Sequence, residues 1–284
     1  MLFLILSIFC SVTVGVIFKI SHRHQSNTTQ IITFNYVIAL FLCYFFFKPH
    51  FTTLATSSAW PIYVALGILL PTIFFVLVLS IQHMGIVKTD AAQRLSLFIP
   101  ILAAWLIFDE QFNTLKIAAL LVGFPALVFL LIKPTANQEN KWMYPVLVLL
   151  GFGLIDILFK QIALYTQLPF TTSLFVIFAI SLAIMVLITL YTILLQKEKF
   201  SSKSVFWGLL VGIFNFGNIF CYLKAHQAFA KNPSTVFAGM NMGVIVIGSL
   251  VGILIFKEKI TKLNFTGLFL ALIAIVLIVL SQIS

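Results

Sequence analysis

Charged residues are scarce in this chain. Lys, Arg, Asp and Glu make up only 8% of its 284 residues, whereas a soluble globular domain carries about 25%. Cysteine is scarce as well: Cys10, Cys43 and Cys221 lie inside apolar stretches without C-x-x-C spacing, so we interpret them as small buried apolar residues. These features exclude a soluble globular domain, a disordered chain, a disulfide-stapled secreted domain and a nucleic-acid-binding domain.

Known catalytic motifs are also lacking. The sequence contains no H-E-x-x-H, no G-x-S-x-G, no Walker loop and no Cys/His metal-ligand spacing, and its five His residues are scattered. We therefore predict that the protein is not an enzyme, binds no cofactor and does not drive transport by hydrolysing ATP.

Apolar residues, by contrast, make up 62% of the chain, and its mean hydropathy is +1.15. A helix of about 20 apolar residues crosses a bilayer core about 30 Å thick, and continuous apolar runs favour helices. We predict an all-α, multi-pass protein of the cell (inner or plasma) membrane whose first apolar stretch is a helix and not a signal peptide. The ten predicted transmembrane helices are Leu2–Ile20, Ile31–Phe47, Trp60–Ile81, Ala91–Phe108, Leu115–Ile132, Met143–Tyr165, Phe170–Leu195, Val205–Ala230, Pro233–Phe256 and Leu263–Leu280.

The two halves of the chain repeat one pattern. Residues 95–131 align with residues 243–279 at a constant offset of 148, which sets IFDEQFNTLK against IFKEKITKLN; near the start of each half, Lys19 aligns with Lys160. We therefore predict a five-helix repeat at residues 1–133, a connector at 134–141 and a second five-helix repeat at 142–284. Because five is odd, the second repeat enters the membrane from the opposite side, so the two are inverted repeats.

The repeated segment also resembles a known family. Residues 89–131 open with small residues, place Pro100 in mid-helix and Glu110 at the helix end, and continue into a Gly-containing helix. Residues 232–280 are a second copy, with Gly248 in place of Pro100 and Glu258 in place of Glu110. This pattern resembles the EamA-type transporters of the drug/metabolite transporter (DMT) superfamily. The resemblance implies a ten-helix transporter whose central cavity is formed by helices one to four and six to nine, with helices five and ten at the periphery.

Loop charges and the resemblance disagree about orientation. If the N-terminus is cytoplasmic, the inner connectors hold five cations and the outer connectors twelve. The positive-inside rule therefore favours both termini outside, whereas the resemblance implies both inside. Orientation stays open at this point, as does the choice between a monomer and a homodimer.

Polar groups at membrane depth are the candidates for function, because a charge there costs about 3 kcal/mol unless it is paired or faces water. Two acid–base pairs, Asp90/Arg94 and Asp156/Lys160, are spaced at i, i+4, which puts both members of each pair on one helical face. The alternative to a role in function is that the two charges neutralise each other only so that the helix can insert into the membrane. Asp90 is predicted to lie at a helix end, so we do not include it among the substrate-binding residues. Intramembrane amides are candidates too, although each alone is more commonly a helix–helix hydrogen-bond partner. The predicted substrate-binding residues are Lys19, Asn35, Gln93, Arg94, Asp156, Lys160, Asn215, Asn218 and Asn241.

These features favour a secondary transporter that exports a small organic solute by alternating access. Cations outnumber acids in the helices and helix one holds no acid, so we expect an anionic or zwitterionic solute, such as an amino acid. Protons are a candidate coupling ion, with Asp156 taking a proton as the cavity closes and freeing Lys160 for a substrate carboxylate. The alternatives are a structural or channel-like membrane scaffold and an exporter of cationic drugs.

Overall fold

The computed structural model describes residues 2–24, 26–49, 60–96, 98–99, 113–131, 141–165, 169–228 and 233–283. Within these residues the chain is all-helical, as predicted, and contains no strand. Its elements are α1 (Leu2–Arg23), α2 (Thr28–Phe47), α3 (Trp60–Met84), α4 (Ile86–Leu95), α6 (Thr114–Leu131), α7 (Met143–Tyr165), α8 (Phe170–Leu194), α9 (Ser202–Ala228), α10 (Pro233–Leu250), the π-helical turn η2 (Val251–Ile255) and α11 (Lys262–Ile283).

Most helices follow the apolar runs closely. Met143–Tyr165 has the predicted bounds, and α2 begins only three residues before its apolar run because the side chain of Asn27 accepts a hydrogen bond from the N–H of Gln30 at 3.1 Å. At the other end of α2, Lys48 takes a left-handed conformation with φ of 44°, which stops the helix. The apolar runs therefore set the helices, and local capping sets their ends.

Two predicted helices differ from the structure. The fourth was expected at Ala91–Phe108, whereas α4 begins five residues earlier, at Ile86, and is described only as far as Leu95. Residues 97 and 100–112 lie outside the described part, as does the predicted connector up to residue 140. The ninth was expected as one continuous helix, whereas α10 ends at Leu250 and passes into η2. A π-helical segment of this kind is frequent at functional sites.

Five of the described helices are long and apolar enough to cross a membrane. Large apolar side chains on the outside of the bundle are widely exposed, with Leu121, Leu194 and Leu254 each about 70% exposed. Exposed apolar surface of this extent is what a lipid environment accommodates. The candidate spans are Leu2–Arg23, Thr28–Phe47, Trp60–Met84, Phe170–Leu194 and Ser202–Ala225.

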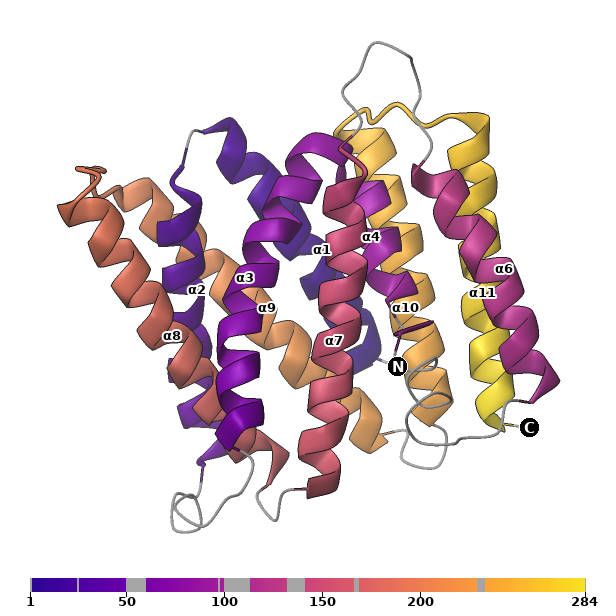
Figure 1. Cartoon of the computed structure of the whole chain (residues 1–284), viewed down its shortest axis with the longest axis horizontal. Helices are drawn as coiled ribbons and strands as arrows, with labels where there is room; N and C mark the ends of the chain where they lie inside the picture. Colours follow the sequence, from indigo (N-terminus) through magenta and orange to yellow (C-terminus); the bar gives the residue numbers. More distant parts are fainter. Residues whose placement is uncertain are drawn as a thin grey trace.

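The helices form one bundle in which segments distant in sequence are neighbours (Figure 1). The pair α6 and α11 stands together at one edge of the bundle, and α8 with α2 forms the opposite edge. Between these edges α1 packs on α9 and α10, while α7 packs on α3 and α4. The centre of the bundle is therefore enclosed by helices of both halves of the chain.

The packing of α9 on α2 depends on glycine. A Cβ at Gly208 would lie 2.7 Å from the carbonyl oxygen of Ile31, and a Cβ at Gly212 would lie 2.8 Å from the carbonyl oxygen of Asn35. Only glycine allows the backbones of two helices to approach so closely. These two residues hold α9, and the polar side chains further along it, against the first half of the chain.

Candidate functional site

A cavity of about 560 Å³ lies inside the bundle, within the range of small-molecule sites. Its lining residues come from α1, α2, α3, α4, α7, α8, α9 and α10, and none of them comes from α6 or α11. These are helices one to four and six to nine of the ten predicted helices. The described lining residues therefore agree with the cavity that the family resemblance implies. The polar side chains that line it are Ser11, Tyr36, Asp90, Gln93, Arg94, Ser96, Asp156, Asn215, Asn218, Tyr222 and Asn241.

One wall of the cavity is aromatic. Phe74 of α3 lies on it, packs on the ring of Phe18 and packs edge-on against Tyr36 with ring centroids 6.1 Å apart. Phe178 also packs on Tyr36, with ring centroids 6.1 Å apart. Aromatic rings give an apolar surface with fixed geometry, suited to the apolar part of an organic solute. Phe152, Phe159 and Phe170 extend this wall.

Arg94 is the centre of the polar part of the cavity. Its Nη2 donates a hydrogen bond to Ser11 Oγ of α1 at 2.8 Å, while its Nε is buried and has no hydrogen-bond partner among the described residues. Asp90, Asp156 and Tyr222 act on it electrostatically. Neither acid comes within 4.0 Å of the guanidinium; the ion pair formed by described residues is that of Lys19 with Glu258. Arg94 therefore keeps donor capacity for an anionic group.

The two carboxylates lie on different helices. Asp90 is only 8% exposed, and its Oδ2 is directed at Gly248 of α10 and has no hydrogen-bond partner in the described part. Asp156 comes from α7, in the other half of the chain, and its strongest electrostatic partner is Arg94. Its expected partner, Lys160, lies one turn further along α7 with a side chain outside the described residues. An acid of the second half and a cation of the first half therefore line the same cavity and attract each other.

Amides of α9 are oriented by hydrogen bonds from the first half. Ser7 Oγ donates to Asn218 Oδ1 at 2.7 Å, and Asn215 Nδ2 donates to Asn35 Oδ1 at 3.1 Å. A side-chain oxygen that is already satisfied leaves the NH₂ group of Asn218 to donate elsewhere. The α9 amides thus face the cavity in fixed positions.

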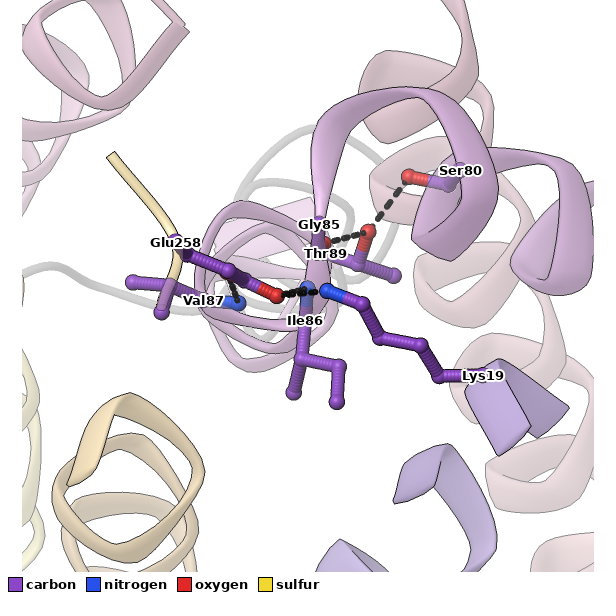
Figure 2. Close-up of polar contacts among 7 residues, drawn as sticks. All are labelled: Lys19, Ser80, Gly85, Ile86, Val87, Thr89 and Glu258. Carbon is purple, nitrogen blue, oxygen red and sulfur yellow. Dashed lines mark hydrogen bonds and ion pairs between the residues drawn. The ribbon is translucent and has the colours of Figure 1, made fainter. Parts of the chain in front are cut away.

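Six of the nine predicted site residues line the cavity: Gln93, Arg94, Asp156, Asn215, Asn218 and Asn241. Lys19 and Asn35 do not. Lys19, at the end of α1, forms its ion pair with Glu258 (Figure 2), and Asn35 is fully buried between α2 and α9, where it accepts the hydrogen bond of Asn215. The ninth, Lys160, lies on α7 with a side chain outside the described residues.

Sequence reasoning missed several residues of the cavity. Asp90 was set aside as a residue at a helix end, but the early start of α4 places it within the helix and on the cavity wall. Ser11 and Tyr36 are ordinary helix residues in the sequence, and nothing in the local pattern distinguishes them. Tyr222 does carry a signal in the sequence, although it was not among the predicted site residues: it follows Asn215 and Asn218 at helical spacing, on the same face of α9.

Comparison with known proteins finds a close relative of the whole chain but no matching family model. A protein of Haemophilus influenzae, described as uncharacterized, is 44% identical over 282 residues, which cover 96% of this chain and 95% of that protein. The chain belongs to the family of this protein.

A solved structure supports the fold. One crystal structure of a protein matches 98% of this chain and 96% of its own chain, with a TM-score of 0.54 and 15% sequence identity. At this identity the likeness shows the arrangement of the helices and nothing of a ligand or an activity.

Proposed function

We propose that the protein is a secondary transporter of the cell membrane that exports a small organic solute by alternating access. The observation that carries this proposal is the cavity, because it is enclosed by eight helices drawn from both halves of the chain and joins an aromatic wall to Arg94, two acids and several amides. A cavity at the seam of two helical repeats is the usual position of a transporter's binding site. The sequence resemblance to EamA-type members of the DMT superfamily supports the same function.

The neighbour pattern of the helices supports inverted repeats. If residues 1–133 and 142–284 are the repeats, α1 corresponds to α7, α3 to α9 and α4 to α10. A symmetric pair of repeats should then show matching contacts. In the first set α1 packs on α9 and α10, and in the matching set its counterpart α7 packs on α3 and α4; both sets are present. The pairs α6/α11, α4/α10 and α2/α8 each join counterparts. Two halves related in this way give a carrier two equivalent conformations.

The charges in the cavity favour a zwitterionic solute over a simple anion. Two cations of the helices do not line the described cavity wall: Lys19 is paired with Glu258, and Lys224 is exposed and donates to Gln227 at 3.2 Å. The described charges that remain on the cavity wall are Arg94, Asp90 and Asp156. Arg94 suits a carboxylate and Asp156 an ammonium group, so an amino-acid-like solute fits both.

A cationic drug is the second candidate, because two acids face one cation in the described wall. A ligand screen separates the candidates. Purified protein is heated with single metabolites, among them amino acids and their N-acetyl forms, and with quaternary ammonium compounds, since a ligand raises the unfolding temperature of the state that it binds. Stabilisation by an amino acid supports the proposal. Stabilisation by quaternary ammonium compounds alone, lost in Asp156→Asn, contradicts it.

Transport itself is tested with the solute so identified. Reconstituted vesicles should take up labelled solute with a saturable rate, which a channel or a scaffold does not give. A protein that binds no metabolite and moves none would be a structural component of the membrane, and the proposal would then be wrong.

A further inference from the structure

Glu258 occupies an unusual place between the two halves of the bundle (Figure 2). It lies in the short segment between η2 and α11, and its side chain is only 12% exposed. Its Oε1 accepts a hydrogen bond from the N–H of Ile86 at 2.8 Å, and its Oε2 accepts one from the N–H of Val87 at 3.2 Å. A carboxylate from the second half of the chain therefore caps the first turn of α4, in the first half, where the helix dipole favours negative charge.

Cations of the first half gather around the same carboxylate. The ammonium group of Lys19, on α1, forms an ion pair with Glu258 Oε1 and lies 4.7 Å from the ring centroid of Phe256. Lys88 of α4 is 7% exposed and is attracted electrostatically to Glu258. Two cations and the positive end of α4 thus converge on a single acid.

The backbone makes room for this carboxylate. Gly85 has φ of +87°, a conformation that favours glycine, and a Cβ there would lie 2.6 Å from Glu258 Oε2. A Cβ at Gly252 would lie 3.0 Å from the same oxygen. The contact of Glu258 with α4 is therefore specific and closely packed.

The contact lies one helical turn from the cavity. Gly15, four residues before Lys19, lines the cavity, and so does Ile81, four residues before Gly85. Thr89 Oγ1 shares a hydrogen bond of 2.7 Å with Ser80 Oγ and donates to the carbonyl of Gly85 at 2.7 Å, which ties α4 to α3 (Figure 2). Breaking the Glu258 contacts would therefore free α3 and α4 as a unit from the second half.

We propose that Lys19, Glu258 and the N-terminus of α4 form an ionic latch that closes this end of the cavity and opens in the opposite conformation of the carrier. The proposal rests on the proposed function, since only a carrier needs this end to open. With the latch formed, α1 and α4 are held to the η2–α11 segment. With the latch released, Lys19 and the positive N-terminus of α4 repel each other, which favours separation.

The test follows the accessibility of a cysteine and needs no substrate. In a background with Cys10, Cys43 and Cys221 replaced by Ala, Gly15→Cys is the reporter, because among the described residues a Cβ at Gly15 would meet only Ile81 Cδ1, at 3.9 Å. A membrane-impermeant maleimide is added to right-side-out and to inverted vesicles. Lys199→Cys, at an exposed position in the α8–α9 connector, shows in a parallel sample which preparation presents the latch end; this connector and the η2–α11 segment lie at the same end of the bundle (Figure 1).

We expect Glu258→Gln and Lys19→Gln each to speed labelling of the reporter from the latch end by about tenfold, as the loss of a charge-assisted hydrogen bond implies. The double variant should be no faster than the faster single variant. Reversing both charges, Lys19→Glu with Glu258→Lys, should not slow labelling to the original rate, because a lysine at 258 cannot accept from the α4 N–H groups. Glu198→Gln is the matched control, since Glu198 accepts a hydrogen bond from Asn27 Nδ2 at 2.6 Å in the α8–α9 connector.

Unchanged labelling in both single variants, or an equal increase in Glu198→Gln, would overturn the latch. Lys19→Gln leaves the cap of α4 intact, so it tests the latch even if Glu258→Gln does not fold. Labelling and flux are separate measurements. If the latch variants speed labelling but the protein shows no saturable flux, the proposed function is contradicted and the latch contact is not.

Discussion

At the scale of single residues, the polar wall of the cavity is organised by contacts between distant parts of the chain. Arg94 is oriented by Ser11, 83 residues earlier, and Asn218 by Ser7, 211 residues earlier. Each contact joins two helices, so the donor groups are held before any solute arrives. A site preorganised in this way loses less conformational freedom on binding.

Arg94 should be required for binding. Replacing it by Gln removes the cation that faces a carboxylate, and a hydrogen bond to a charged group is worth about 1.5–3 kcal/mol. We expect Arg94→Gln to weaken binding of the stabilising solute by roughly tenfold or more, measured from the concentration dependence of the unfolding temperature. Lys224→Gln is the matched control and should bind normally, because the side chain of Lys224 is exposed. Equal weakening in both variants would show that the cavity was assigned to the wrong residues.

Asp156 should recognise the ammonium end of a zwitterion. Asp156→Asn should then weaken binding of the amino acid but leave binding of its N-acetyl form, which lacks the ammonium group, nearly as in the unmodified protein. The two ligands are compared by isothermal titration on both proteins. If Asp156→Asn weakens both ligands equally, Asp156 acts on the structure of the cavity and not on the ammonium group.

At the scale of helices, the sequence predicts positions well and junctions poorly. Continuous apolar runs located α7 at its observed bounds and α3 to within three residues, because a run that must be buried in lipid or in the bundle ends where polar residues begin. The start of α4 was missed because its cap, Glu258, is 172 residues away in the sequence. The same reason explains why Lys19 was predicted to bind substrate: its ion-pair partner, Glu258, is 239 residues away in the sequence.

The close contact of α9 with α2 gives a test at this scale. In Gly208→Ala the added Cβ would overlap backbone atoms of α2, which cannot move aside as a flexible side chain does. We expect a loss of stability of about 1–3 kcal/mol, seen as a lower unfolding temperature of the purified protein. Gly217→Ala on the same helix is the control and should be milder, because its nearest neighbour is the Cys10 sulfur at 3.3 Å. Equal losses in the two variants would contradict the close packing of the two backbones.

At the scale of the whole molecule, the bundle joins two halves of similar sequence around one cavity. The two predicted repeats meet along the pairs α6/α11, α4/α10 and α2/α8, and the Lys19–Glu258 ion pair joins them at one end. Polar residues from both parts of the chain therefore line one cavity. The sequence repeat indicated the two halves, but the placement of Arg94 and Asp156 on the wall of one cavity depends on how the helices pack, which the repeat does not specify.

The most direct test of the account is solute counterflow in vesicles that contain only this protein. Vesicles are loaded with unlabelled solute identified by thermal stabilisation, diluted into a trace of labelled solute, and sampled over time. A carrier that alternates between two conformations predicts a transient accumulation of label inside, abolished in Arg94→Gln and retained in Lys224→Gln. Label that only equilibrates, at a rate linear in solute concentration, would contradict alternating access.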